Sequence, residues 1–482
     1  MPIAESSVTI LKLIVSLVVI MSSNVSFSGD AVRKAFKAYD VRGKIPEELS
    51  SEIVQFIGNA FVSFLKLSSG SLVVGYDVRP TSFDFSKALI KGITDHGLDV
   101  IDIGLCGTDM VYYATAALNA AGGVMITASH NPANYNGLKF VRENAIPISG
   151  DTGLIDICDL VVAKNYVKKD KKGTIAERSV LPHYIDHILK FVDVRKIPSL
   201  KVVMNAGNGC AGVVLPELVK RLPSLKVVPV FWQPDGSFPN GIPNPLLSER
   251  REDTRKQVLE EKADLGVAWD GDFDRCFFYD NEGNFIEGYY LVPLFGEFFA
   301  KRKPGSKIIH DPRLIWATID VIKTAGGVPV ETKAGHAFIK ERMRQEDAIY
   351  AGEMSAHHYF KDNFYADNGM IPMLLLLQIL GETGKSLREL VNGWMAKYPV
   401  SGEINITVAN ADKVISKLKE SYAKNAVSID EVDGVSINYE KWRFNIRKSN
   451  TEPVIRLNVE SRNDSKLMEQ KRDEILSFIK QA

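Results

Sequence analysis

The sequence predicts an α/β protein with three similar domains, whose sheets are mixed or largely parallel, followed by a small C-terminal α+β domain. Apolar strand-like runs alternate with amphipathic helical stretches over most of the chain, which is typical of parallel sheets covered by helices on both faces. The alternation recurs in three units and stops near the C-terminus. A chain of 482 residues is also too long for one core and predicts roughly three to four domains.

The first unit, predicted over residues 31–178, opens with the segment 36–43. A helix is expected over 53–65, because large apolar residues recur there at helical spacing. Strands are expected at 72–74, 99–103 and 124–126, and the polar loop TASHNP at 127–132 follows the last of them. Ser129 and His130 therefore stand at the carboxyl end of a strand, where open α/β sheets place their chemistry. Taken alone, such a pair is more often part of a polar surface turn.

The next two units, predicted over 179–284 and 285–396, repeat the pattern more weakly. Strands are expected at 201–204, 225–230 and 263–268 in the second unit and at 307–310, 327–330 and 348–350 in the third. The last strand of each unit leads into a distinctive loop, DGDFDR at 270–275 in the second unit and GEMSAH at 352–357 in the third. Each of the three units thus presents one such loop at the same edge of its sheet.

The remaining segments lie at the two ends of the chain. In the C-terminal domain, 397–482, strands are expected at 402–408, 435–439, 442–446 and 454–459, and helices at 411–422 and at the very end. The strand pair that flanks the loop RKSNTEP at 447–453, with helices set apart from it, predicts an α+β domain. Residues 1–30 form an N-terminal extension whose apolar run 13–21 resembles the core of a secretion signal. Its basic flank is poor and the run is too short to span a bilayer, so a dispensable extension or an upstream start, a signal peptide and a membrane-surface anchor all remain open.

Composition excludes some partners. The formal net charge is zero, so no global field favours nucleic acid or an anionic membrane. An anionic substrate must then be held by local positive groups. The four cysteines, Cys106, Cys158, Cys210 and Cys276, have neither CxxC nor zinc-site spacing. Free thiols in a reducing compartment, and hence a cytoplasmic protein, are the simplest expectation.

The loop at 270–275 predicts a metal site. Asp270, Asp272 and Asp274 alternate along it, and three carboxylates so close repel one another unless a cation neutralises them. Their hard oxygen atoms suit Mg²⁺ or Ca²⁺. A calcium-binding EF-hand is rejected, because its required glycine and glutamate positions hold Arg275 and Asn281. The other interpretation is a solvated acidic turn.

Two further loops suit a sugar phosphate. RKSNT at 447–451 offers a guanidinium, hydroxyls, an amide and turn backbone N–H groups, the composition of a phosphate-binding loop. Glu353, Ser355 and His357 alternate after a predicted strand, so we expect them to point to one side and meet sugar hydroxyls. A capped helix start is the alternative for that triplet. With the serine and the aspartates, these loops predict phosphoryl transfer on a sugar, and no nucleotide-binding GxxxxGK[ST] loop is present.

The motifs TASHNP, DGDFDR, GEMSAHH and RKSNTEP, in this order, resemble those of the α-D-phosphohexomutases from about residue 36 to the C-terminus. Connecting stretches such as PDGSFPNGIPNP at 234–245 look like the bacterial phosphomannomutases that supply GDP-mannose for surface polysaccharides. The resemblance implies four domains around a central cleft, a phosphorylated Ser129 in the resting enzyme, and one Mg²⁺ per chain. A hexose 1,6-bisphosphate would be both intermediate and activator.

The resemblance also implies roles for single residues. Lys139 and His336 would help with proton transfer, and His130 and Arg275 would support the phosphoserine. The implied metal ligands are Ser129, Asp270, Asp272 and Asp274. The implied substrate-binding residues are Tyr39, Arg42, Arg313, Gly335, Glu353, Ser355, His357, Arg447, Ser449, Asn450 and Thr451.

The expected function is therefore a phosphomannomutase that interconverts mannose 6-phosphate and mannose 1-phosphate. Glucose and mannose differ only at the 2-hydroxyl, which Glu353 and Ser355 are not expected to contact. A phosphoglucomutase or dual-specificity enzyme is thus the main alternative, and a non-catalytic sugar-phosphate-binding protein a distant one. The expected partners are small sugar phosphates and no nucleic acid, with no membrane partner apart from the open question of residues 1–30. We expect a monomer or a homodimer.

Overall fold

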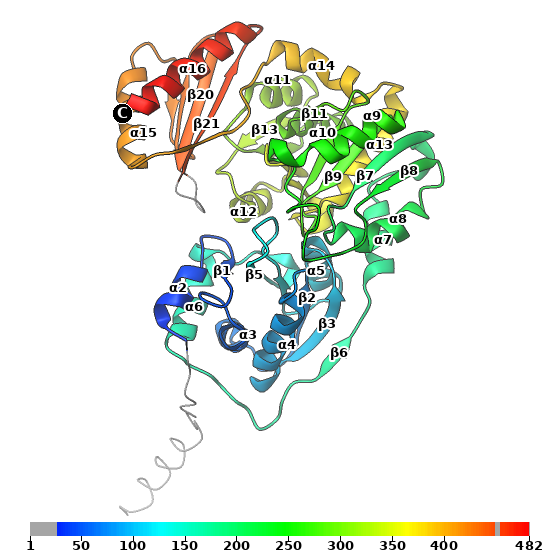
Figure 1. The fold of residues 1–482 in the computed structure, drawn as a ribbon, viewed down its shortest axis with the longest axis vertical. Helices are drawn as coiled ribbons and strands as arrows, with labels where there is room; N and C mark the ends of the chain where they lie inside the picture. The colour runs from blue at the N-terminus through cyan, green and yellow to red at the C-terminus, as the bar shows by residue number, and fades with distance from the viewer. Residues whose placement is uncertain (1–26, 449–453, 482) are drawn as a thin grey trace, which may run out of the picture.

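The computed structural model describes residues 27–448 and 454–481. Within them the strands form four separate sheets, one of six strands and three of five. The first sheet and its helices make up the lower part of Figure 1, in blue and cyan, and the other three sheets lie above it, in green, yellow and orange-red. The predicted fold class, three α/β domains and a C-terminal domain, is confirmed.

The first sheet is mixed. Its strands are β1 (Val41–Lys44), β2 (Ser71–Tyr76), β3 (Asp99–Leu105), β4 (Gly122–Ile126), β5 (Tyr135–Arg142) and β6 (Ile175–Glu177). The order is β1-β5-β4-β2-β3-β6. Strands β4, β2, β3 and β6 are parallel, β5 pairs antiparallel with β4, and β1 pairs antiparallel with β5. The sequence analysis missed β1 and β5, because polar residues such as Asn136 and Lys139 interrupt their apolar pattern.

Helices cover both faces of this sheet, as predicted. They are α2 (Gly29–Ala35), α3 (Ser51–Leu65), α4 (Ser82–Asp95), α5 (Thr108–Ala117) and α6 (Leu154–Val162). The apolar residues of α3, α4 and α6 pack with Leu72, Val74 and Val124 on one face. Those of α5 pack with Val73 and Met125 on the other face, which joins the core of the following domains. Alternate residues of these strands thus pack into two different apolar cores, one on each face of the sheet.

The second and third sheets each combine three parallel strands with two antiparallel strands at one edge. The second has the order β11-β10-β9-β7-β8 and the third β13-β12-β14-β15-β16. The strands are β7 (Leu200–Asn205), β8 (Leu225–Val230), β9 (Leu265–Trp269), β10 (Cys276–Tyr279), β11 (Phe285–Ile286), β12 (Lys307–His310), β13 (Val328–Glu331), β14 (Tyr350–Gly352), β15 (His358–Phe360) and β16 (Ala366–Asp367). The helices are α7 (Leu181–Leu189), α8 (Ala211–Val219), α9 (Glu252–Glu261), α10 (Gly288–Arg302), α11 (Trp316–Thr324), α12 (His336–Glu346), α13 (Met370–Thr383) and α14 (Leu387–Lys397).

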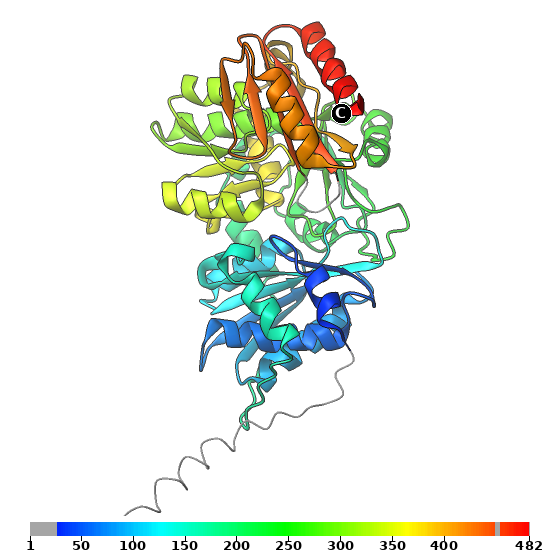
Figure 2. The same ribbon diagram turned by 90° about the vertical axis from the view of Figure 1, so that its left-hand side faces the viewer.

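The fourth sheet is antiparallel throughout, with the order β17-β21-β20-β19-β18. Its strands are β17 (Ile404–Thr407), β18 (Ser428–Asp430), β19 (Val435–Asn438), β20 (Trp442–Lys448) and β21 (Val454–Ser461), and α15 (Ala411–Tyr422) and α16 (Ser465–Gln481) accompany it. The predicted strand pair is β20 and β21, at the centre of this larger sheet. Figure 2 shows this domain, in orange and red, beside the green and yellow domains.

One large apolar core runs through the first three domains, and the C-terminal domain has its own. The shared core includes α13, which is apolar on all sides and buried along most of its length, as expected for a helix enclosed by neighbours. The core of the C-terminal domain runs from Val414 to Ile479. The four cysteines are free, as the sequence predicted, and all four are buried. Among the described helices, none is long and apolar enough to cross a membrane.

Candidate active site

The three loops that the sequence singled out meet in space. The serine loop follows β4, the aspartate loop joins β9 to β10, and the third joins β14 to β15. The Ser129 hydroxyl donates a hydrogen bond to Asp270 Oδ2 at 2.8 Å. Arg275 and His357 form a β-bridge between the aspartate loop and the third loop. Each loop follows a strand of its own sheet, as the repeated pattern predicted, and the three loops together line one site.

Ser129 lies in a constrained position. Its φ angle is 49°, a left-handed conformation that is uncommon for a residue other than glycine. Its N–H donates to Thr127 Oγ1 at 2.8 Å, and its side chain is nearly covered, because the whole residue is only 3% exposed. The hydroxyl is thus held toward Asp270, away from bulk solvent.

His130 lies beside this serine, and its surroundings favour the uncharged imidazole. Its Nδ1 lies 3.1 Å from Ser129 Oγ and accepts a hydrogen bond from the guanidinium of Arg275. Burial, together with the positive charges of Arg275 and Arg42, lowers the pKa of His130 well below its usual value. Since Nδ1 already accepts an N–H from an arginine, this nitrogen has no lone pair left to remove the serine proton. The geometry agrees with the predicted supporting role.

The three aspartates fit a cation. All three are buried, and one carboxylate oxygen from each lies within 4.8 Å of the others. Asp272 Oδ1 and Asp274 Oδ1 are buried with no hydrogen-bond partner among the described residues. Orphaned buried carboxylate oxygens are costly, and a hard divalent cation satisfies such atoms. The donor set therefore suits Mg²⁺.

Lys139, on β5, neutralises the other side of the same carboxylates. Its Nζ lies 2.7 Å from Asp272 Oδ2 and 2.6 Å from Asp274 Oδ2. Burial alone would lower the pKa of Lys139, but Asp272 and Asp274 raise it well above the usual value. The ammonium thus stays protonated and suits stabilisation of negative charge better than removal of a proton.

The third loop is a tight hairpin rather than an extended segment. Glu353 N–H donates to the His357 carbonyl at 2.9 Å, and Ala356 has φ 69°. The members of the predicted triplet have different partners. Arg313 Nη2 lies 3.4 Å from both Glu353 Oε1 and Ser355 Oγ, whereas His357 lies beside Asp274 and Asp367.

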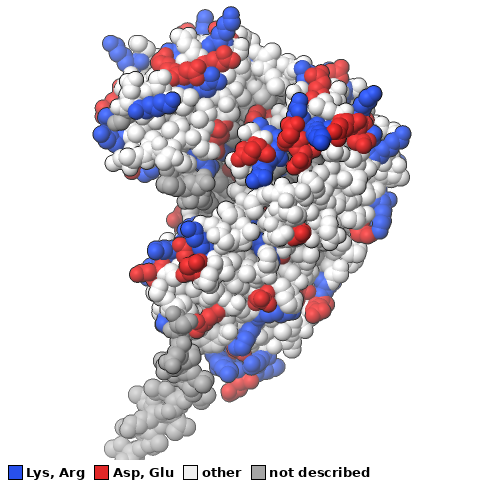
Figure 3. All heavy atoms as spheres, in the orientation of Figure 1, with Lys and Arg blue, Asp and Glu red and all other residues white. Residues whose placement is uncertain are grey.

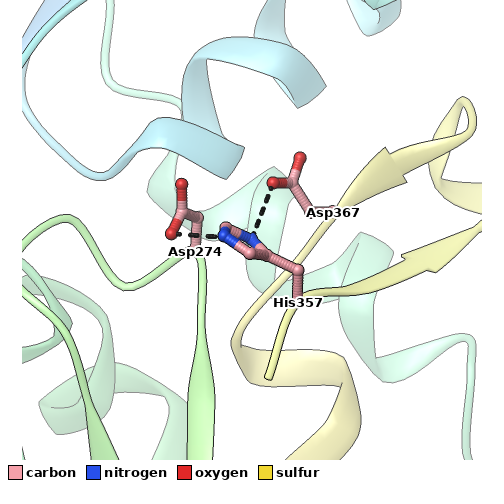
Figure 4. Close-up of side chains that lie close together, drawn as sticks. All are labelled: Asp274, His357 and Asp367. Carbon is pink, nitrogen blue, oxygen red and sulfur yellow. Dashed lines mark ion pairs between the residues drawn. The ribbon is translucent and has the colours of Figure 1, made fainter. Parts of the chain in front are cut away.

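His357 bridges two aspartates (Figure 4). Its Nδ1 lies 3.2 Å from Asp367 Oδ2 and 3.9 Å from Asp274 Oδ1. Lys340, which is fully buried, places its Nζ 2.6 Å from Asp367 Oδ1. The sequence analysis missed Lys340 and Asp367, since an isolated lysine on a helix and an isolated aspartate on a short strand carry no local pattern.

Tyr39, Gly335 and His336 connect the first domain to the third. The Tyr39 ring packs edge-on against His336, with centroids 5.6 Å apart, and Gly335 N–H donates to Glu353 Oε1 at 2.9 Å. Burial lowers the pKa of His336 well below its usual value, with Lys340 adding to the effect. Its Nδ1 is buried and has no hydrogen-bond partner in the described structure. An uncharged imidazole with an open nitrogen suits proton transfer.

Arg42 and Arg447 reach the site from opposite domains. Arg42 donates to Asp40 at 2.8 Å and to Asn131 Oδ1 at 2.7 Å, beside the serine loop. Arg447, at the end of β20, faces Glu403 at 3.4 Å. The space-filling view is hollowed between the first and the C-terminal domains (Figure 3). Three predicted phosphate-binding residues, Ser449, Asn450 and Thr451, lie outside the described residues.

Arg79 is a site residue that the sequence analysis did not identify. Its guanidinium donates to the carbonyls of Ser129, Asn131, Pro132 and Tyr135 at 2.6–2.9 Å. The residue is only 2% exposed and pairs with Asp77 at 3.3 Å. Arg79 follows β2 in the segment GYDVR. A charged residue placed just after a buried strand is the sequence feature that could have identified it.

Comparison with known proteins identifies the family. The descriptions that match are "Phosphoglucomutase/phosphomannomutase, alpha/beta/alpha domain I" over residues 33–163, domain II over 182–283, domain III over 287–398, and the C-terminal domain over 403–477. A phosphomannomutase of Escherichia coli is 54% identical over 452 residues, covering 92% of this chain and 99% of the relative. Phosphohexose mutases of Xanthomonas campestris pv. campestris are 50% identical over 446 residues, with the same coverage.

Solved structures agree. The phosphoglucomutase/phosphomannomutase family protein of Burkholderia thailandensis superposes with a TM-score of 0.83 at 30% identity, covering 93% of this chain and 97% of the other. A phosphomannomutase, described as putative, from Thermus thermophilus shares the fold with a TM-score of 0.77 at 22% identity, over 92% of this chain and 98% of its own. With four consecutive domain matches and relatives at about half identity, this chain belongs to the phosphoglucomutase/phosphomannomutase family.

Proposed function

We propose that the protein is a phosphomannomutase that interconverts mannose 6-phosphate and mannose 1-phosphate. The observation that carries this proposal is the contact between Ser129 and Asp270, which joins a phosphate-accepting hydroxyl to a cation site. Phosphomannomutases of Escherichia coli and Vibrio cholerae, at 54% and 50% identity over nearly their whole lengths, support the choice of reaction. The enzyme is an isomerase.

In the proposed cycle Ser129 carries the phosphate and exchanges it with the sugar. The phosphoserine gives its phosphoryl group to a free sugar hydroxyl, forming a hexose 1,6-bisphosphate, and Ser129 then accepts the other phosphate. Mg²⁺ bound by Asp270, Asp272 and Asp274, with Ser129, would neutralise phosphoryl charge there. Lys139 and Arg275 hold fixed positive charge beside the transferred group, where it stabilises the transition state.

Protons must leave and return at the sugar and serine oxygens. His336 is uncharged and has an open nitrogen, so we assign it the role of base toward the sugar hydroxyl. Lys139, whose pKa is raised, keeps its proton and would assist by donating a hydrogen bond to the transferred phosphoryl group rather than by accepting a proton. Asp270 accepts the hydrogen bond of Ser129, and it orients the hydroxyl that receives the returning phosphate.

Sugar binding is assigned to the groups around Arg313. Glu353 and Ser355 would hold the 3- and 4-hydroxyls, with Gly335 and His357 close by, and Tyr39 and Arg42 would line the first-domain side. Arg447, with Ser449, Asn450 and Thr451, would grip the phosphate that is not reacting. These contacts are common to glucose and mannose, and one misplaced hydrogen bond costs only ~1–3 kcal/mol. A phosphoglucomutase or dual-specificity activity is therefore the second candidate.

Coupled assays with mannose 1-phosphate and glucose 1-phosphate separate the two candidates, and a kcat/KM ratio near one would favour dual specificity. Ser129→Ala should abolish turnover while binding of mannose 1-phosphate, measured by calorimetry, survives. Ser86→Ala, at a buried serine whose hydroxyl donates to the Phe83 carbonyl of its own helix, is the matched control. Near-normal turnover by the Ser129 variant would refute the mechanism. The intact mass of the purified protein should include one phosphate, located on the Ser129 peptide.

The setting of the reaction is also proposed. Mannose 1-phosphate would feed the synthesis of GDP-mannose and, through it, surface polysaccharide. That supply belongs in the cytoplasm, which agrees with four free cysteines. Hexose 1,6-bisphosphate would serve as activator, and we expect a monomer or homodimer, to be measured by light scattering.

A further inference from the structure

One carboxylate, Glu403, faces three guanidinium groups at the boundary of the third and C-terminal domains. Its Oε2 lies 3.3 Å from Arg313 Nη1 and 3.4 Å from Arg447 Nη2, and its Oε1 lies 3.3 Å from Arg456 Nη1. We call these three arginines the arginine cluster. Glu403 belongs to the segment between α14 and β17 that joins the two domains.

The arginine cluster is well shielded but not fully compensated by Glu403. The side chains of Arg313 and Arg447 are 3% and 7% exposed, and that of Glu403 is 20% exposed. Arg313 also binds Asp311 through two hydrogen bonds of 2.8–2.9 Å. For Arg447 the next carboxylate is Asp433, at 3.9 Å, and the Arg447 Nε atom is buried without a hydrogen-bond partner in the described structure. Arg447 is therefore left with unused donor capacity.

A phosphate group matches what Arg447 lacks. A guanidinium binds phosphate and carboxylate oxygens through the same paired N–H groups, so the two anions compete for one arginine. The contacts of Glu403 at 3.3–3.4 Å are longer than tight ion-pair contacts of about 2.7–2.9 Å. Such a carboxylate holds the arginine in place, and a doubly charged phosphate can replace it.

We propose that Glu403 is an internal competitor of phosphate: it occupies Arg447 when no sugar phosphate is bound, and the incoming phosphate displaces it. This inference rests on the proposed function, because it concerns the phosphate that is not reacting. In that cycle the bisphosphate turns around, so the phosphate bound at Arg447 must leave that residue and the other phosphate must take its place. A carboxylate that takes over Arg447 lowers the free energy of the empty site and so makes release easier.

Glu403→Gln tests the inference, because it removes the charge and keeps the shape. Calorimetric titration with mannose 1-phosphate, and separately with inorganic phosphate, would be done in the Ser129→Ala background, where turnover is absent. We expect the Kd of both ligands to fall about fivefold, as the loss of one partly exposed competing charge implies. In the otherwise unaltered enzyme KM should fall and kcat should not rise.

A positioning role for Glu403 predicts the opposite result, since loosened arginines would bind phosphate more weakly. An unchanged or increased Kd would therefore overturn the proposal. Glu403→Ala should give the same direction as the glutamine variant, and thermal melts establish that both are folded. Glu382→Gln is the control. Glu382 also pairs with two basic residues, Lys196 and Arg302, but it lies at the C-terminal end of α13 and contacts none of the arginine cluster in the described structure. If Glu403→Gln binds phosphate more tightly but the unaltered protein shows no mutase activity, the proposed function is refuted and the inference about Glu403 stands.

Discussion

The guanidinium of Arg79 donates a 2.9 Å hydrogen bond to the backbone carbonyl of Ser129, fifty positions further along the chain. The same group holds three more carbonyls of the serine loop. Because those carbonyls all point at Arg79, the loop has one orientation, and the left-handed backbone of Ser129 is kept in place. Arg79 is thus a positioning residue for the serine.

We expect Arg79→Lys to lower kcat by about 100-fold while KM for mannose 1-phosphate changes little. A lysine keeps the charge but cannot reach four carbonyls, and a displacement of about 1 Å at a reacting group costs about 10²-fold in rate. Steady-state kinetics with both sugar phosphates measure the effect, and Arg221→Lys, at an exposed arginine, is the control. A rise in KM with unchanged kcat would assign Arg79 to substrate binding instead.

Gly271→Ala should abolish activity with only a local structural change. A Cβ at this position would lie 2.4 Å from the Ser129 carbonyl oxygen, so the aspartate loop and the serine loop must separate. The contact between Asp270 and Ser129 would then be lost. Gly393→Ala, on α14 with nothing within 4 Å of the added Cβ, should instead stabilise the fold by about 0.5–1 kcal/mol. Activity assays and denaturant unfolding of both variants distinguish a clash between the two loops from a general effect of replacing glycine with alanine.

Lys139→Met should destabilise the protein in a metal-dependent way. Removing the ammonium leaves Asp272 and Asp274 buried without their partner, which typically costs ~3–5 kcal/mol. A bound divalent cation compensates part of that charge, so the loss should be larger in EDTA than in saturating Mg²⁺. Urea unfolding in both conditions gives the two values. Lys201→Met, at a half-exposed surface pair with Glu261, should cost no more than about 1 kcal/mol and respond equally in both. Equal losses for Lys139→Met would argue against a cation at the three aspartates.

Glu331→Gln should stabilise the protein at pH 8 but not at pH 4.5. Burial, which Arg443 only partly offsets, raises the pKa of Glu331 to about 7. The folded protein therefore binds this proton more tightly than the unfolded chain does, and stability is lost as the pH rises from about 4.5 to 7. Removing the group should recover on the order of 1 kcal/mol above pH 7. Melting temperatures across pH 4.5–8 test this. Glu382→Gln, where ion pairs lower the pKa to about 2, should instead destabilise the protein nearly equally across this range, because that contribution is lost only as the pH falls below about 4.5.

The sequence by itself predicted the repeated α/β domains and the loops after β4, β9 and β14, because alternation and apolar runs are local patterns with a fixed geometric meaning. That Ser129 and the aspartates share a site was implied by the resemblance of the motifs to a known family, not by the repeated pattern. The sequence analysis missed β1 and β5, where polar residues that line the site, such as Lys139, break the apolar pattern.

Only the tertiary structure decided which charges face one another. Arg79 and Ser129, Lys340 and Asp367, and Glu403 and Arg447 are well separated in sequence, and these contacts depend on how the strands, helices and loops of one domain pack together. Ser129 illustrates the division. The other motifs and the family that they resemble predicted a phosphate carrier, but packing decided that its hydroxyl faces Asp270 and that burial and nearby arginines lower the pKa of His130. A pKa and a hydrogen bond depend on every charge and surface within a few ångströms, and folding brings most of those from distant parts of the chain.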